Sequence, residues 1–129
     1  NPLSLTPGAG TLQYLQENSD IYDDMMAKGE FLRSGFNDWC ASKGYPFCMT
    51  GIGSMFQIHA KADLPVLARD LPGQDEEALA ELQLHFRFNN VLLPWMHLAF
   101  FSAAHTQEDL EEMLRAFKAS VEGVMNSRK

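Results

Sequence analysis

A long amphipathic helix in the first half of the chain is the feature that most constrains the fold. Its apolar side chains recur at helical spacing, with the acidic residues mostly off the stripe formed by Ile21, Met25, Leu32, Phe36 and Trp39. Gly44 suits the C-terminal cap, and Pro46 prevents the helix from continuing. A helix with one apolar stripe must bury it against other elements, so this segment predicts one layer of a packed core.

A shorter helix is predicted before the long one. Thr6 can cap its N-terminus, and Pro7 suits the first helical position because the N–H group that proline lacks has no partner there. Leu12 and Leu15 are expected to face the core. Residues 18–20 (Asn-Ser-Asp) break the pattern and supply a cap for the long helix.

Two further helices are predicted in the second half of the chain. Asp75 is expected to cap the first of them, whose apolar stripe consists of Leu79, Leu82 and Phe86. Thr106 precedes Asp109 by three residues, which is a variant of the capping box, and the helix that follows is expected to end near Gly123.

Short apolar segments favour strands between these helices, at 47–49, 54–60, 91–93 and 98–101. Residues 51–53 (Gly-Ile-Gly) turn the chain between the first two strands, and the prolines and glycine of 61–74 indicate an irregular excursion. Strand pairs that alternate with helices predict an α+β fold, a small antiparallel sheet of three to four strands packed against helices. The length fits one domain covering residues 1–129.

Composition and charge exclude several classes of function. A formal net charge of −7 without clusters of Lys and Arg argues against nucleic-acid binding and against an anionic membrane surface. No apolar run approaches the length that spans a bilayer. Two cysteines, Cys40 and Cys48, are too few for a disulfide framework and match no metal motif, so we expect buried, reduced thiols in a cytoplasmic protein.

The residues alone define no complete active site. None of the four histidines has metal-ligand spacing to a partner, so we interpret them as surface or packing residues: His59, His85, His97 and His105. The ring of His105, just before the last helix, is expected to bond a loop carbonyl. Gly51-x-Gly53 precedes a strand rather than a helix, which excludes a phosphate-binding loop.

Four motifs nevertheless resemble one family, and they occur in its order. Asn1-Pro2-Leu3 is similar to the end of a Thr-x-Ser-Gly-Asn-Pro-Leu segment, and the stretch 51–56 (Gly-Ile-Gly-Ser-Met-Phe) resembles a Val-Gly-Ser-Met-Phe strand entry. Residues 91–94 (Val-Leu-Leu-Pro) resemble a Gly-Val-x-Leu-x-Pro element, with Asn90 in place of the glycine. Residues 101–109 resemble Phe-x-Ser-x-Ala-His-Thr-x-Glu-Asp. All four are motifs of class-III aminotransferases and glutamate-1-semialdehyde aminomutases.

The resemblance implies the C-terminal small domain of a fold-type I enzyme that uses pyridoxal phosphate (PLP) and works as a homodimer. The large domain, with the Schiff-base lysine and most cofactor contacts, would then lie before Asn1, and this chain alone would bind no cofactor and catalyse nothing. None of its lysines matches the family's catalytic position: Lys28, Lys43, Lys61, Lys118 and Lys129. We accordingly identify no catalytic, cofactor-binding or metal-binding residue in this chain.

Two departures from the family pattern limit what the resemblance carries over. Aminomutases typically have Ser-x-Phe-Glu where residues 95–99 here read Trp-Met-His-Leu-Ala, without an acid, and this difference favours a general aminotransferase. Trp95 and Met96 could line the mouth of the substrate pocket, with core packing as an equal alternative. Arg87 is the nearest candidate for binding a substrate carboxylate, although we favour a surface position for it.

A second hypothesis is a stand-alone interaction module that has kept the small-domain fold without the cofactor. The chain opens with Asn1-Pro2-Leu3 and no initiator methionine, so we expect a piece of a longer polypeptide instead. A severed domain should expose the apolar surface that faced its partner and should self-associate, whereas a module should be a monomer with a polar surface. An unrelated α+β enzyme would need a polar site that the sequence does not show.

Overall fold

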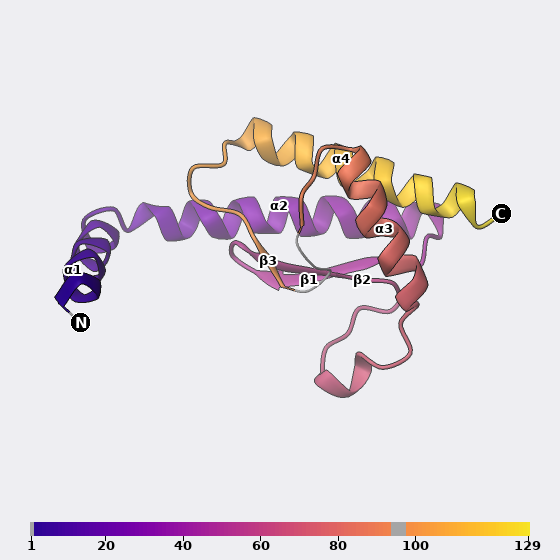
Figure 1. Cartoon of the computed structure of the whole chain (residues 1–129), viewed down its shortest axis with the longest axis horizontal. Coiled ribbons are helices and arrows are strands. Elements are labelled where there is room, and N and C mark those ends of the chain that lie inside the picture. The colour runs from indigo at the N-terminus through magenta and orange to yellow at the C-terminus, as the bar shows by residue number, and fades with distance from the viewer. Residues whose placement is uncertain (1, 94–97) are drawn as a thin grey trace.

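Helices and a small sheet alternate along the chain in the computed structural model, which describes residues 2–93 and 98–129 (Figure 1). The elements follow in the order α1 (Pro2–Glu17), α2 (Asp20–Lys43), β1 (Cys48–Ile52), β2 (Met55–His59), the 3-10 helix η1 (Ala68–Asp70), α3 (Glu76–Phe88), β3 (Ala99–Phe100) and α4 (Gln107–Ser127). The predicted α+β class is therefore confirmed. Within the described residues, no helix is long and apolar enough to cross a membrane.

The sheet is antiparallel and has the strand order β1-β2-β3 in the described residues. Cys48 pairs with His59 and Ile52 with Met55, and Met55 pairs in turn with Phe100. Because side chains alternate along a strand, all five residues lie on one face of the sheet, which we call the outer face. The opposite face carries Met49, Phe56 and Ile58, all at most 3% exposed, and forms the core.

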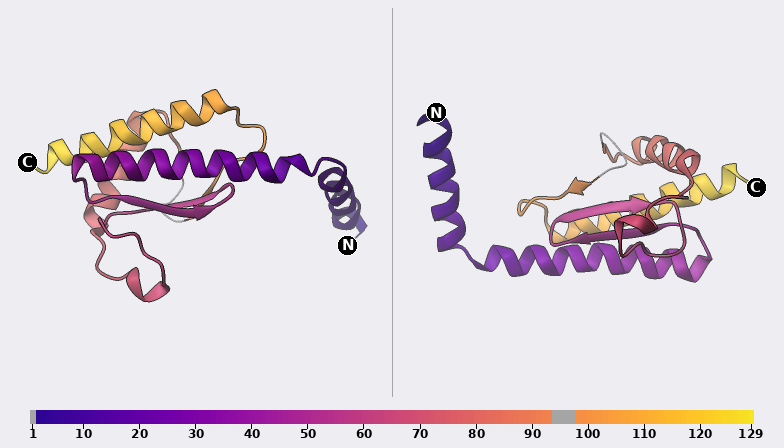
Figure 2. Two further views of the ribbon diagram at one scale, coloured as in Figure 1. Left: turned by 180° about the vertical axis from the view of Figure 1, so that it is seen from behind. Right: turned by 90° about the horizontal axis from the view of Figure 1, so that it is seen from below.

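Helices α2, α3 and α4 cover the core face, as the predicted stripes require (Figure 2). Phe117 of α4 lies at the centre, with ring centroids 6.3 Å from Phe36, 5.8 Å from Phe56 and 4.9 Å from Phe86. Leu32 and Leu82 complete this cluster and have no exposed surface. Each fully buried side chain of this size contributes about 1.5–3 kcal/mol, so these rings hold the helices to the sheet.

The predicted helix ends are confirmed where local chemistry determines them. Gly44 caps α2 in the left-handed conformation at φ 65°, and the Asp75 side chain accepts a hydrogen bond from Ala78 N at the start of α3. Thr106 and Asp109 form the capping box of α4. These groups pair backbone atoms that a helix end otherwise leaves without partners.

The first helix differs from the prediction. It begins at Pro2 rather than at Pro7, which lies inside α1, because Pro2 suits the first helical position equally well. Leu12 is 71% exposed and Leu15 only half-buried, so the expectation that both face the core is wrong. The reason is that α1 projects away from α2 and packs on none of the described layers (Figure 1).

Three other predicted boundaries are wrong. Residues 91–93 form no strand, and Leu92 is 80% exposed. The apolar run predicted a strand, but such a run does not show whether another strand lies beside it. The strand expected at 98–101 is reduced to β3, which pairs only with the start of β2. Helix α4 continues past Gly123 to Ser127, because Gly123 is packed against the ring of His85 rather than placed at a helix end.

Candidate functional site

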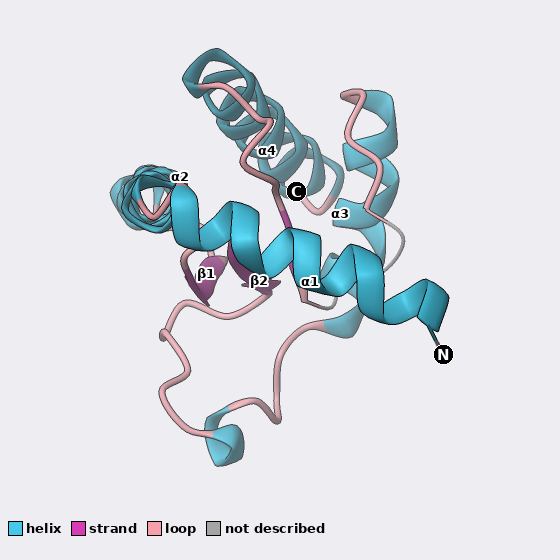
Figure 3. Cartoon of the chain, turned by 90° about the vertical axis from the view of Figure 1, so that its left-hand side faces the viewer, coloured by secondary structure: helices cyan, strands magenta, loops and turns pink. Residues whose placement is uncertain are grey.

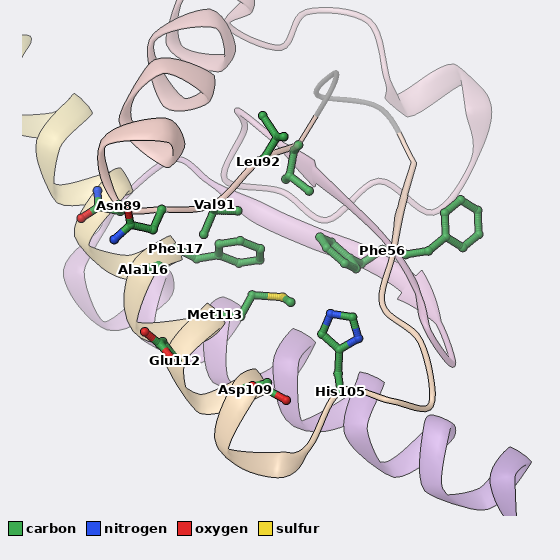
Figure 4. Close-up of a pocket in the computed structure, with 13 residues that line it drawn as sticks. Phe56, Asn89, Val91, Leu92, His105, Asp109, Glu112, Met113, Ala116 and Phe117 are labelled. Atoms are coloured by element: carbon green, nitrogen blue, oxygen red, sulfur yellow. The ribbon is translucent and has the colours of Figure 1, made fainter.

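The residues that the sequence nominated for a substrate pocket, Trp95 and Met96, lie outside the described residues. The neighbouring described segments border a cavity of about 310 Å³ (Figure 4). Its walls come from residues 89–93, which follow α3, from Phe56 of β2 and Phe100 of β3, and from His105 with the first half of α4. The motif at 101–109 thus contributes to the wall of a cavity as well as to a helix cap.

The cavity combines an apolar interior with a polar rim. Its apolar side chains include Phe56, Val91, Met113 and Phe117. Asn89 on the rim already donates to His85 O at 2.9 Å and to Ser120 Oγ at 3.0 Å, so its amide ties α3 to α4. Such a lining suits a small apolar group with one polar contact.

His105 supplies that polar contact. Its Nδ1 accepts a hydrogen bond from Ser102 N at 3.1 Å, and Ser102 Oγ lies 3.1 Å from the same nitrogen. The expectation that the ring bonds a loop carbonyl is therefore wrong, because the backbone N–H group of Ser102 turns towards the ring. A neutral imidazole that accepts at Nδ1 carries its proton on Nε2. Figure 4 shows the ring directed into the cavity near Met113.

The acidic residues of the rim do not form an acid–base pair. Asp109 Oδ2 accepts from Thr106 N at 2.7 Å and from Thr106 Oγ1 at 2.8 Å. These bonds to the backbone and side chain of Thr106 hold the pKa of Asp109 below its usual range. The carboxylate is therefore committed to the helix cap, and Glu112 is the other acidic side chain that lines the cavity.

The thiols and the lysines are equally unsuited to covalent chemistry. Burial raises the pKa of Cys40 to about 12 and that of Cys48 to about 11, so both thiols stay protonated and unreactive near neutral pH. Lys28 Nζ pairs with Asp24 at 2.6 Å, and Lys118 Nζ lies 5.9 Å from the centre of the Trp39 ring. No lysine is among the described residues that line the cavity.

Other expectations for single residues are met in part. Arg87 is exposed on α3, as expected, and Cys40 and Cys48 are free and buried. His59 is fully buried, His85 and His105 are half-buried, and His97 lies outside the described residues. The described part of the chain holds no group of three or more residues that could bind a metal ion.

The fold is that of one part of PLP-dependent transaminases. A transaminase with PLP bound superposes with a TM-score of 0.78 over 98% of this chain, at 22% sequence identity. The crystal structure of an omega-transaminase from Sphaerobacter thermophilus superposes with a TM-score of 0.79 over 97% of this chain, at 20% identity. In both cases the match covers 28% of the larger protein.

Sequence comparison gives the relationship more specifically. The glutamate-1-semialdehyde 2,1-aminomutase of Methanococcoides burtonii is 32% identical over 123 residues, which cover 94% of this chain and 29% of the relative. The corresponding enzyme of Thermus thermophilus is 33% identical over 124 residues, which cover 90% of this chain and 28% of the relative. No family model matches the chain. The chain is thus similar in sequence to aminomutases and in fold to PLP-dependent transaminases, and it spans less than a third of the length of either.

The sequence indicated part of the cavity and missed the rest. The motif at 101–109 drew attention to His105 and Asp109, whereas nothing in the sequence connected Asn89, Glu112 and Met113 with a cavity. They reach the cavity only because α3 and α4 pack side by side, which no local spacing reveals.

Proposed function

We propose that this chain is the C-terminal small domain of a class-III PLP-dependent aminotransferase. The whole enzyme would move an amino group between an amine or amino acid and a keto acid or aldehyde. It would be a cytoplasmic homodimer, with the Schiff-base lysine on a large domain that precedes Asn1. The relatives named above support this proposal because they match nearly all of this chain with less than a third of their own length.

The cofactor would belong to the large domain, because the described residues do not fit PLP. The cavity next to His105 has the carboxylates of Asp109 and Glu112 on its rim, where a phosphate group would be repelled. It also lacks a lysine for the imine among its described residues. When bound by the large domain, PLP would supply the electron sink for amino transfer, and we assign no step of that chemistry to this chain.

The exposed apolar surface is the observation that carries the proposal. Helix α1 exposes Leu5, Leu12 and Tyr14, at 71%, 71% and 59%, and buries none of its described side chains. Next to the β1–β2 turn, three exposed apolar side chains form a row across the outer face of the sheet, which we call the apolar row. It consists of Ile52, Met55 and Phe100, which are 57%, 36% and 63% exposed.

The two apolar surfaces lie at the same end of the molecule. Figure 3, viewed from that end, shows α1 passing across the end of the molecule where the β1–β2 turn lies. Apolar side chains that are exposed together on two elements mark a surface that another protein segment covers. We infer that the missing remainder of the enzyme covers both.

The interaction module with the same fold is the alternative. The exposed row favours the severed domain, since a module evolved to be a monomer would carry polar residues there. The sequence relatives are aminomutases, so an aminotransferase reaction for the whole enzyme is part of the proposal. The stretch 95–99 lacks the acid that typifies aminomutases, and for this reason we favour an aminotransferase.

Reading the coding sequence upstream of Asn1 tests the proposal first. An open frame that contains Thr-x-Ser-Gly and an upstream buried-strand lysine supports it, and a start codon directly before Asn1 contradicts it.

The second test is sedimentation of the 129-residue chain. We expect concentration-dependent self-association that Ile52→Lys with Phe100→Asp abolishes. Leu84→Asp is the matched control, because Leu84 is 54% exposed but lies on α3, away from the row. A monomeric parent chain would favour the module.

A further inference from the structure

The excursion between β2 and α3 covers the half of the outer face that the apolar row leaves open. Its base is closed by a hydrogen bond from Asp75 N to Ala60 O at 3.1 Å. Beneath it, Cys48 is 4% and His59 1% exposed, and Cys48 Sγ lies 3.7 Å from Asp63 O. Figure 1 shows the excursion, with η1 at its far end, on the side of the sheet away from α2 and α4.

His59 lies at the base of this excursion with only one of its ring nitrogens paired. Nε2 is 2.8 Å from Thr50 Oγ1, the neighbouring side chain on β1. Nδ1 faces Oε1 of Gln74, the last residue of the excursion, and neither of these buried atoms has another hydrogen-bond partner. A bond between Nδ1 and Oε1 needs a proton on Nδ1, so the strength of this contact depends on the protonation of the ring.

The contact between His59 and Gln74 depends on a proton. Burial lowers the pKa of His59, the Gln74 side chain opposes this as a hydrogen-bond partner of the charged ring, and the charge of Lys61 lowers the pKa further. Burial is the largest of these influences, so the closed excursion favours the neutral imidazole. Exposed to water, the same ring would take up a proton near pH 6.5, which is about the ordinary value for histidine.

The other charged groups around the excursion are already paired or lie at its surface. Lys61 Nζ donates to Asp70 O, while the Asp70 carboxylate accepts from Val66 N at 3.1 Å and from Leu67 N at 2.8 Å. Asp75 pairs with Arg128, which follows α4. Asp63 and Arg69 are exposed, and the Cys48 thiol is protonated. His59 is therefore the buried, unpaired titratable group of the excursion's base, and burial lowers its pKa.

We propose that His59 is a proton-operated latch that holds the 61–74 excursion on the sheet while its ring is neutral and releases it when the ring takes up a proton. Release would uncover Cys48, Thr50 and His59 and so extend the exposed outer face beyond the apolar row. The sign follows from linkage. The open state binds the proton more tightly than the closed state, so the opening equilibrium increases as pH falls below the open-state pKa. The opening equilibrium stops increasing once the pH is below the closed-state pKa, because the ring is then protonated in both states.

Labelling of the Cys48 thiol measures this opening directly. A Cys40→Ala chain leaves Cys48 as the single thiol, and 4,4′-dithiodipyridine reacts with thiols in acidic as well as neutral buffer. At each pH, we divide the labelling rate of the urea-unfolded chain by that of the folded chain. This ratio, the protection of Cys48, is free of the reagent's own pH dependence. We expect this protection to fall by up to about tenfold per pH unit below pH 6.5, the limit for one proton.

Matched variants assign the effect to His59. His59→Gln should remove the pH dependence, whereas Asp63→Asn and Asp70→Asn should keep it. In a Cys48→Ala chain, Cys40 in the helix–sheet core should stay protected over the same range. Protection of Cys48 that does not vary with pH overturns the proposal, as does an unchanged pH dependence in His59→Gln or a parallel loss at Cys40, which would mean global unfolding.

Nuclear magnetic resonance of the His59 ring keeps the test decisive if His59→Gln does not fold. Its ring protons in the wild-type chain should titrate with a midpoint below pH 6.5, because the closed state that dominates the signal lowers the pKa of the ring. A ring midpoint at or above pH 6.5 contradicts the latch, as does titration of the ring without loss of Cys48 protection.

Discussion

The Asn37 side chain binds both backbone groups of Met49. Asn37 Oδ1 accepts from Met49 N at 2.7 Å, and Asn37 Nδ2 donates to Met49 O at 2.9 Å. These two backbone groups lie on the free edge of β1 and point away from β2. Without Asn37 they would be available to pair with a strand of another chain. Helix α2 thus closes part of the sheet edge with a single amide and fixes its own position along β1.

Asn37→Leu should be strongly destabilising. The substitution leaves Met49 N and O unpaired in a partly buried place, which costs about 1–3 kcal/mol per group. Urea unfolding followed by circular dichroism measures the change. Asn37→Asp is the informative control, because it keeps the acceptor for Met49 N and loses the donor to Met49 O. We expect its loss to be smaller than that of Asn37→Leu, and a change below about 0.5 kcal/mol in both variants would contradict this role.

Gly29→Ala should destabilise the chain because α2 touches the β1–β2 turn at this residue. A Cβ atom at Gly29 would lie 1.9 Å from Gly53 O, a backbone atom that Arg33 Nη1 also contacts at 3.2 Å. Helix and turn would have to separate, and we expect a loss of about 2 kcal/mol or more.

Gly10→Ala is the matched control for Gly29→Ala. Gly10 is also helical, but it has nothing within 4 Å of its Cβ position. There alanine should stabilise α1 by up to about 1 kcal/mol, since it restricts the unfolded chain and favours helix. Equal effects in the two variants, measured by thermal unfolding, would show that the close approach to Gly53 has no energetic weight.

The capping box of α4 should give the chain an acid-sensitive contribution to stability. Because hydrogen bonds from Thr106 hold the folded-state pKa of Asp109 below 3.8, the unfolded chain binds the proton more tightly. The contribution is present above the unfolded-state pKa and is lost as pH falls through the folded-state pKa. Asp109→Asn should therefore lower Tm at pH 7, and its difference from wild type should shrink below pH 3.8. A difference that is the same at pH 7 and pH 2.5 would contradict the assignment.

Features determined by neighbouring residues were predictable from the sequence, and features determined by distant ones were not. The caps at Gly44 and Asp75 follow from local chemistry and were confirmed. The strand expected at 91–93 was wrong because an apolar run does not specify what it packs on. The exposure of Leu12 on α1 was also missed, because periodicity shows an apolar side chain without showing whether this chain covers it.

The same limit applies to the candidate site and its surroundings. His105 was noticed because a motif contains it, but its partner Ser102 N depends on how the loop turns. The pairing of Asn37 with Met49 joins residues 12 positions apart, and the contact of His59 with Gln74 depends on the path of the whole excursion. Neither pattern leaves a periodic signal in the sequence.

Gly123 and His85 offer a test of how α3 and α4 pack. A Cβ atom at Gly123 would lie 2.4 Å from His85 Nδ1 and 2.5 Å from Cε1, so Gly123→Ala must displace the imidazole ring. We expect this variant to lose about 1–3 kcal/mol, the usual cost of overpacking. The obstacle is one side chain, and His85→Ala removes it. In the His85→Ala background, Gly123→Ala should be neutral or stabilising, because alanine favours a helix interior over glycine by about 1 kcal/mol. The double-mutant cycle should therefore give a coupling energy of about 1–3 kcal/mol between the two sites. Additive effects would mean that Gly123 is required for the backbone of α4 itself, and the ring contact would then be a consequence of the helix packing rather than a determinant of it.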